Sequence, residues 1–329
     1  MQNQNAPTPI AVLVIGYIRE YQITQCIQQV STLNPYRIYL AFDGPKTEED
    51  QMKINKARSA ALKEVKWKCE IYTYFSNKNL GCKKFPISAI SWFFKSEPEG
   101  IILEDDILIH PYFVEFIRRC NHYASINSIE YIGLISACSY PSLLSRRSGS
   151  LENNFITMIE SKIPNIWGWY SKRSIWDEFH IFNTTSSISS ISTFKSLAKS
   201  ISIKQAILFT LCIRLAKLNL LDAWDYLFLE FLITKGYKTI IPSVSLSSNI
   251  GFDKDATHTA NEMSPTSSLP SDLFISNTQR LIEDKKYDCK ISLNAPWQKA
   301  YNIHAAKGVL RIVFDKVLYY VKNLYKFYS

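Results

Sequence analysis

Three consecutive carboxylates, Glu104, Asp105 and Asp106, are the strongest chemical signal in the sequence. They directly follow the apolar segment Ile101-Ile102-Leu103, which predicts a buried strand, so the acids must be held together where that strand ends. Carboxylates crowded in this way repel one another unless a cation lies between them. Oxygen ligands of this kind suit Mg²⁺ or Mn²⁺. The pattern therefore predicts a divalent-cation site, with an acidic turn before Pro111 as the alternative.

Two further polar segments follow predicted strands. Asp43, in Asp43-Gly44-Pro45, closes the β-rich segment 36–42. Its carboxylate can accept hydrogen bonds from a base or a ribose, although D-G-P is also an ordinary turn sequence. Asn79-Leu80-Gly81 follows the segment 69–75, and a glycine in such a turn permits close approach of the backbone to a ligand. Neither signal is specific by itself.

The segments around these residues alternate between strand-like and helix-like patterns. Strands are predicted at 9–16, 36–42, 69–75 and 100–103, and helices at 21–33, 47–63, 86–94 and 111–123. This order predicts an α/β fold with a mainly parallel sheet covered by helices. Such sheets bind ligands beyond the carboxyl ends of their strands, so Asp43, Asn79 and the three acids are expected at one edge.

The second half of the chain is less regular. Strands are predicted at 130–136 and 239–246, and helices at 204–221 and 224–235. The segment 183–202 is rich in Ser and Thr and is expected to be a loop, with a lid as the alternative. Trp167-Gly168-Trp169-Tyr170 is a compact aromatic cluster.

Composition excludes several classes of protein. The 329 residues include 38 Lys and Arg against 29 Asp and Glu, and the net charge of +9 favours an anionic partner. No nucleic-acid-reading module is present, so nucleic acid is not expected as that partner. The apolar runs are shorter than the ~20 residues of a spanning helix, and the run 10–15 lacks the flanks of a signal peptide. Seven scattered cysteines without a C-x-x-C pair indicate free thiols and a cytoplasmic location.

Two stretches are both basic and apolar. Between Lys195 and Lys217 every charged residue is basic, and the tail from Lys307 to Lys326 interleaves basic with aromatic and aliphatic residues around a lone Asp315. Basic amphipathic helices suit the surface of an anionic bilayer. Peripheral association with the cytoplasmic face of the inner membrane is therefore expected, and a terminal helix docked on the core with a solvated basic face is the alternative.

Seven motifs occur in an order that resembles a known enzyme family. They are V-L-V-I-G-Y-I-R, F-D-G-P, N-L-G-C, L-E-D-D-I, W-G-W, W-D-Y and N-I-G-F-x-x-D-A-T-H-T, spread over residues 9–259. Their succession is similar to nucleotide-sugar glycosyltransferases of the GT-A fold. More narrowly, it resembles bacterial sugar transferases of surface-polysaccharide clusters and, distantly, an N-acetylglucosaminyltransferase that carries an E-D-D motif.

The resemblance implies a role for each motif in the donor site. Glu104, Asp105 and Asp106 stand at the family's D-x-D-type motif, where Asp106 would bind the metal that bridges the donor diphosphate and Asp105 would lie near the donor ribose or sugar. Asp43 would contact the uracil or another base. The other residues that the resemblance places against the donor are Gly16, Tyr17, Arg19, Asn79, Gly81, Trp167, Gly168 and Trp169.

Chemistry in such an enzyme needs a base for the acceptor hydroxyl. The resemblance places Asp225 in that role, with Asp222 as an alternative, while a helix cap and a first-turn acid are the structural explanation of the two. His258 would be a second metal ligand, or else a local hydrogen-bonding residue of its loop. Basic charge near the phosphates could come from Arg146, Arg147, Lys172 and Arg173, although surface solvation explains these four equally well.

Together these expectations describe a metal-dependent, inverting glycosyltransferase that uses Mn²⁺ or Mg²⁺. It would transfer a hexosyl or N-acetylhexosaminyl group from a nucleotide sugar, with a UDP-sugar favoured, to a saccharide or lipid-linked acceptor in lipopolysaccharide, O-antigen or capsule synthesis. Residues 1–130 would bind the donor, residues 131–260 the acceptor, and residues 261–329 would form a helical basic extension. The alternatives are a catalytically silent sugar- or lipid-binding scaffold and a nucleotidyltransferase, although only Gly16-Tyr17-Ile18-Arg19 stands where the latter has a Gly-rich basic loop.

Overall fold

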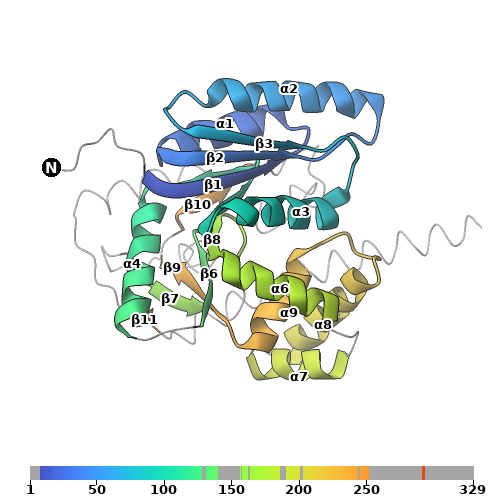
Figure 1. Cartoon of the computed structure of the whole chain (residues 1–329). Coiled ribbons are helices and arrows are strands. Elements are labelled where there is room, and N and C mark those ends of the chain that lie inside the picture. Colours follow the sequence, from blue (N-terminus) through green and yellow to red (C-terminus); the bar gives the residue numbers. More distant parts are fainter. Residues whose placement is uncertain are drawn as a thin grey trace, which may run out of the picture.

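A computed structural model describes residues 8–127, 131–139, 156, 158–161, 164–185, 190–200, 203–243, 245–251 and 291–292. Most strands of these residues form one nine-stranded sheet (Figure 1). Its members are β1 (Thr8–Gly16), β2 (Pro35–Phe42), β3 (Glu70–Phe75), β4 (Glu99–Glu104), β6 (Ile132–Ser136), β7 (Met158–Ser161), β8 (Trp169–Lys172), β9 (Lys238–Pro242) and β11 (Ile291–Ser292). A separate two-stranded sheet pairs β5 (Ile107–Ile109) with β10 (Ser247–Asn249).

The strand order is β11-β7-β9-β6-β8-β4-β1-β2-β3. β1 lies parallel to β2 and β4, and β2 lies parallel to β3, whereas β8 runs antiparallel between β4 and β6. Ile15 is level with Glu104 and Gly16 with Phe42, so the carboxyl ends of these strands meet at one edge. The predicted α/β class is confirmed, since a mainly parallel sheet is flanked by helices.

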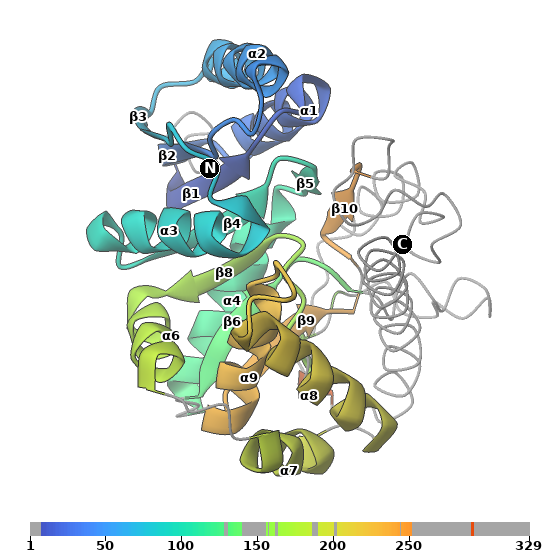
Figure 2. The same ribbon diagram turned by 90° about the vertical axis from the view of Figure 1, so that its right-hand side faces the viewer.

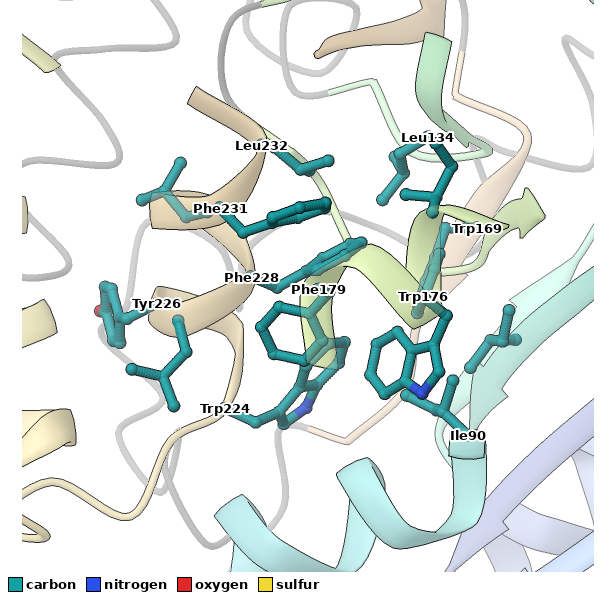
Figure 3. Packing of buried hydrophobic residues seen from close by; sticks show 14 of the residues in the cluster. Ile90, Leu134, Trp169, Trp176, Phe179, Trp224, Tyr226, Phe228, Phe231 and Leu232 are labelled. Atoms are coloured by element: carbon teal, nitrogen blue, oxygen red, sulfur yellow. The ribbon is translucent and has the colours of Figure 1, made fainter. Parts of the chain in front are cut away.

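Helices cover both faces of this sheet (Figure 2). They are α1 (Glu20–Ser31), α2 (Glu48–Glu64), α3 (Gly81–Ser96), α4 (Tyr112–Ile126), α6 (Arg173–Thr185), α7 (Ser190–Ser200), α8 (Ile203–Lys217) and α9 (Asp225–Lys235). Side chains of β1 alternate between the faces: Val12 and Val14 pack with α1, α2 and α4, whereas Leu13 and Ile15 pack with α3, α6, α8 and α9. Most of the buried aromatic residues lie in the core on the face of Leu13 and Ile15, around Trp176 and Phe228 (Figure 3).

The segment 183–202 and the start of α3 differ from the sequence prediction. The segment 183–202 was expected to be a loop, and this is wrong: α6 extends to Thr185, and Ser190–Ser200 forms α7. The helix is stabilised by its neighbours, because Leu197 is buried and Thr193 Oγ1 donates to Glu230 on α9 at 2.7 Å. α3 begins at Gly81 and contains Pro86, although the sequence placed its start at the proline.

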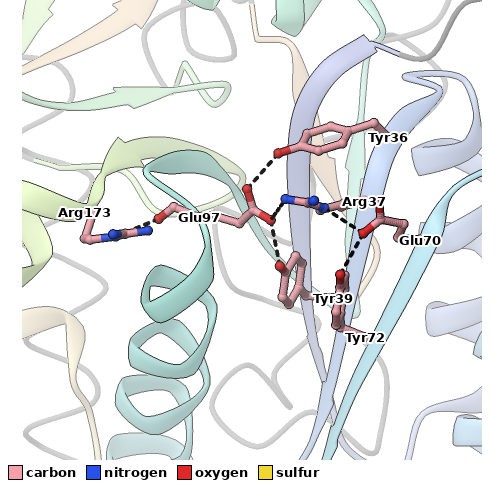
Figure 4. A network of polar contacts seen from close by, with 7 residues as sticks. All are labelled: Tyr36, Arg37, Tyr39, Glu70, Tyr72, Glu97 and Arg173. Atoms are coloured by element: carbon pink, nitrogen blue, oxygen red, sulfur yellow. Dashed lines mark hydrogen bonds and ion pairs between the residues drawn. The ribbon is translucent and has the colours of Figure 1, made fainter.

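Glu97 holds the amino edge of the sheet together. Its fully buried carboxylate accepts hydrogen bonds from Tyr39 (2.6 Å) and Tyr36 (2.8 Å) and pairs with Arg37 at 3.3 Å (Figure 4). Its carbonyl oxygen accepts from Arg173 Nε at 3.1 Å. These contacts join β2, the start of β4 and α6.

Glu97→Ala is expected to lower the free energy of unfolding by about 3 kcal/mol, because it leaves buried donors and part of an Arg37 ion pair without a partner. Urea denaturation followed by circular dichroism measures this loss. Glu70→Ala is the matched control, since Glu70 also pairs with Arg37 but is exposed, and it should cost much less stability than Glu97→Ala. Equal losses in the two variants would contradict the role assigned to Glu97.

Several expectations concern location and the C-terminal region. Among the described helices, none combines the length and the apolar character needed to cross a bilayer. The described cysteines are all free thiols. The predicted basic extension, apart from residues 291–292, lies outside the described residues.

Candidate active site

The loop after β1 and the acidic end of β4 are joined by direct contacts. Asp105 N donates to Ile15 O at 2.9 Å, and Tyr17 N donates to Asp105 Oδ2 at 3.2 Å. The Arg19 guanidinium pairs with Asp105 and lies 2.9 Å from Asp106 Oδ2. The predicted site residues Tyr17, Arg19, Asp105 and Asp106 therefore form one cluster, and Gly16 precedes them at the end of β1, level with Phe42.

One carboxylate oxygen of Asp106 is unsatisfied within the described part of the chain. The residue is buried, and within the part of the chain that the structure describes Asp106 Oδ1 has no hydrogen-bond partner. Burial raises the pKa of Asp106 to about 6, while the Arg19 charge opposes this shift. The segment after β10 closes over the residue, since Ile250 N donates to Asp106 O at 2.9 Å. A Cβ atom on Gly251 would lie 2.0 Å from Asp106 Oδ2, so only glycine fits there.

These residues fit a hard divalent cation. Among the described residues no group of three or more His, Cys, Asp and Glu side chains could hold a metal by itself. Mg²⁺ and similar ions are, however, commonly held by one or two carboxylates together with substrate phosphates and waters. A buried carboxylate oxygen without a donor is the ligand that such an arrangement needs, and Asp106 Oδ1 supplies it.

Glu104 points to the opposite face of the sheet from Leu103, because side chains alternate along β4. Burial, together with the negative charges of Asp106, Asp105 and Asp225, raises the pKa of Glu104 to about 8, while the Arg19 charge opposes the shift. Asp225, in the first turn of α9, therefore lies close enough to Glu104 to act on its ionisation. The structure brings the predicted base into the same site as the acidic motif.

Asp225 is partly buried among apolar neighbours of α8 and α9. Burial raises the pKa of Asp225 to about 6, and the backbone N–H groups of its own helical turn, at Tyr226, oppose the shift. The Asp225 carboxylate is thus a first-turn acid of α9, which is the structural alternative given in the sequence analysis. It also titrates near neutral pH. Those properties are compatible with a general base.

Asp222 has a structural role instead. Its two carboxylate oxygens accept hydrogen bonds from Cys82 N (3.0 Å) and Lys83 N (2.8 Å), which are the first N–H groups of α3. Asp222 therefore caps a helix, which is the structural alternative given in the sequence analysis. The capped helix is α3, which lies about 140 residues earlier in the sequence. This long-range cap also explains why α3 begins before Pro86.

Asp43 is buried and anchors the loop after β3. Oδ1 accepts from Gly44 N and Leu80 N, and Oδ2 accepts from Gly81 N at 2.9 Å and from Asn79 Nδ2 at 3.2 Å. Burial raises the pKa of Asp43, and these N–H groups oppose the shift. Because backbone donors occupy both oxygens, Asp43 positions Asn79 and Gly81 at the site edge, and its expected contact with a base stays a prediction.

The W-G-W segment divides between core and edge. Trp169 is 1% exposed and packs against Trp176, Trp224 and Phe228, so its ring belongs to the aromatic core. Gly168 has a φ of +79°. Trp167 is only partly buried, which makes it the one ring of the segment that a sugar could reach.

Other predicted residues lie elsewhere. Lys172 is level with Glu99 at the amino end of β4, and Arg173 Nε bonds Glu97 O, so this pair lies at the sheet edge opposite the acids. Their expected role near phosphates is wrong, because β8 runs antiparallel to β4. Arg146, Arg147 and His258 lie outside the described residues.

Sequence reasoning missed how the loop after β2 is fixed. Tyr17 Oη donates to Asp50 Oδ2 at 2.9 Å, while Asp50 and Thr47 form a reciprocal capping box at the start of α2. Lys46 Nζ lies 6.0 Å from the centre of the Tyr17 ring. The T-x-x-D spacing of a capping box was the signal available for this contact.

No family model matches the sequence, and no curated protein is significantly similar to it. Weak similarity to solved structures exists. The mannosyltransferase PcManGT from Pyrobaculum calidifontis, in complex with GDP-Man and Mn²⁺, is 9% identical over 96% of this chain and 88% of that chain, with a TM-score of 0.38. Mouse xyloside xylosyltransferase 1 is 10% identical over 69% and 82%, with a TM-score of 0.31. UDP-glucose pyrophosphorylase complexed with UDP-glucose is 7% identical over 70% and 89%, with a TM-score of 0.34. At this level of similarity, the function must be argued from the site itself.

Proposed function

We propose that this protein is a metal-dependent glycosyltransferase that uses a nucleotide-sugar donor. The observation that carries the proposal is the buried Asp106 Oδ1, which lacks a donor among the described residues and lies where the strands of a parallel sheet end. A diphosphate-bound cation would satisfy that oxygen. The same edge carries the Arg19 charge and the loop that Asp43 anchors.

The residues around Asp106 have distinct tasks in this proposal. Asp106 holds the cation, with His258 as its proposed second ligand, and Arg19 fixes the orientation of Asp105 and Asp106 through its ion pairs. The bound ion would stabilise the negative charge that develops on the leaving diphosphate. Gly251 completes the wall of the site, since any larger residue would collide with Asp106.

Asp225 is the proposed general base. A proton leaves the acceptor hydroxyl as its oxygen attacks the anomeric carbon, and a carboxylate with a pKa near 6 is ionised at neutral pH and can accept it. Asp222 is not suited to this task, because both of its oxygens cap α3. Direct attack by the acceptor would invert the anomeric configuration.

The finer details of the proposal rest on the resemblance of the sequence motifs. They are a UDP-sugar as the favoured donor, a hexosyl or N-acetylhexosaminyl group as the transferred unit, a saccharide or lipid-linked saccharide as the acceptor, and bacterial surface polysaccharide as the product. Trp167 is the ring proposed to contact the sugar, because it is partly exposed.

The products formed from nucleotide sugars test the proposed reaction. The protein, supplied with Mn²⁺ and a panel of nucleotide sugars, should release a nucleoside diphosphate, slowly to water and faster once an acceptor is found. Formation of a nucleoside triphosphate on addition of pyrophosphate would instead show a nucleotidyltransferase. Binding of a sugar without any turnover of a nucleotide sugar would support the scaffold alternative and contradict the proposal.

A further inference from the structure

One face of α8 is apolar and exposed. Ile203, Ile207 and Leu211 recur every four residues, so they lie on one side of the helix, and they are 64%, 58% and 42% exposed. Leu218, just beyond the helix end, continues this stripe, and Arg214 lies within it. We call this set the α8 stripe.

The opposite face of the same helix is already used for folding. Ala206, Phe209, Cys212, Ile213 and Ala216 are buried in the core that also contains α9. α8 is therefore apolar on both sides, although only one side packs against the described part of the protein. An amphipathic surface helix normally presents polar residues to water, so the α8 stripe indicates a binding surface.

The charged residues of α7 and α8 are all basic. The sequence has no Asp or Glu between Glu178 and Asp222, and the exposed basic residues include Lys195 and Lys199 on α7, which packs against α8, and Arg214 on α8. A second copy of this face would repel the first. The basic tail 307–326 would also be repelled, so charge argues against both as occupants.

We propose that the α8 stripe docks the protein on an anionic lipid bilayer. Aliphatic side chains flanked by Lys and Arg insert at the boundary between headgroups and acyl chains, where burial of apolar surface and attraction to anionic lipids act together. The C-terminal end of α8 lies beside the candidate active site, since Lys83 Nζ donates to Asn219 Oδ1 at 2.9 Å and Lys83 N donates to Asp222. Docking would thus hold the site near the membrane surface. This proposal does not depend on the donor chemistry.

Sedimentation of the full-length chain with lipid vesicles tests the proposal. The protein should bind vesicles that contain about one third phosphatidylglycerol, and bind pure phosphatidylcholine much more weakly. Raising the salt concentration from about 0.1 M to about 0.5 M should weaken binding, because the basic residues act through screened charges. Absence of binding to the anionic vesicles would overturn the proposal. It is the result expected if the stripe instead binds an acidic protein partner.

Ile207→Glu is the decisive variant, and it is expected to lower the vesicle partition coefficient by about tenfold or more. Ile126→Glu on α4 is the matched control, because Ile126 is 66% exposed but lies outside the α8 stripe, and it should bind like the wild type. Arg214→Glu should also weaken binding, but only to anionic vesicles. Unchanged binding of Ile207→Glu, or equal losses in Ile207→Glu and Ile126→Glu, would overturn the assignment. Thermal unfolding confirms that the variants remain folded, and nucleotide-sugar binding without vesicles should be unchanged in all three.

Discussion

Replacing Asp106 by Asn is expected to weaken Mn²⁺-dependent donor binding at least about 100-fold. The substitution removes the negative charge of the buried Asp106 carboxylate, whose Oδ1 lacks a hydrogen-bond donor among the described residues. Titration of Mn²⁺ followed by electron paramagnetic resonance measures the loss, first with the protein alone and then with the donor present. Turnover should fall to the background level in the same variant.

The loss should not result from unfolding. Asp106 lies beside other carboxylates in a buried place, so its removal relieves repulsion, and Asp106→Asn should be at least as stable as the wild type in the absence of metal. Asp50→Asn is a useful control, because Asp50 lies near the same loop but contacts Tyr17 and the α2 cap instead. Normal Mn²⁺ affinity in Asp106→Asn would remove the basis for the proposed metal site.

The second large effect is expected for Asp225→Asn. An amide cannot accept the proton of the acceptor hydroxyl, so kcat should fall by about 10² to 10⁴. The dissociation constant of the donor should change only about threefold, because Asp225, on α9, is proposed to contact the acceptor hydroxyl, whereas Asp106 would hold the cation on the donor phosphates. Steady-state kinetics together with equilibrium donor binding separate these two effects.

The pH dependence gives a second readout for Asp225. Burial raises its pKa to about 6, so the base is protonated below that pH and ionised above it. The wild-type rate should therefore rise as the pH increases from about 5 to 7 and then level off, and Asp225→Asn should lose this rise. The raised pKa also predicts that the charged form costs stability, so Asp225→Asn should gain stability relative to the wild type above pH 6.

Asp222→Ala serves as the control for Asp225→Asn. It removes the cap of α3 and is expected to cost about 1 kcal/mol of stability while it leaves kcat within about threefold of the wild type. A large loss of kcat in Asp222→Ala, with a normal rate in Asp225→Asn, would reverse the two assignments.

Local patterns predicted the first half of the fold well. The runs that became β1, β2 and β4 end at Gly16, before Asp43 and at Glu104, and the alternation of predicted strands with helical periodicity was sufficient to predict a parallel sheet. The acids of the E-D-D motif were correctly placed at a strand end, since that follows from the sequence next to Leu103.

Long-range contacts explain what local patterns missed. α7 looks like a Ser-rich loop in sequence, and it is helical because Thr193 and Leu197 pack against α9. Likewise, nothing near Gly81 shows that α3 starts there, since its cap comes from Asp222. The antiparallel direction of β8, which carries Lys172 and Arg173 away from the acids, is also a property of the sheet and not of the segment.

The most direct test of the central claim is donor binding to the wild-type protein by isothermal titration calorimetry, with Mn²⁺ and then with EDTA. The proposed function predicts that at least one nucleotide sugar binds with Mn²⁺ and that its affinity falls at least about 100-fold in EDTA. Equal affinity in the two conditions, or no binding of any nucleotide sugar in either one, would contradict it.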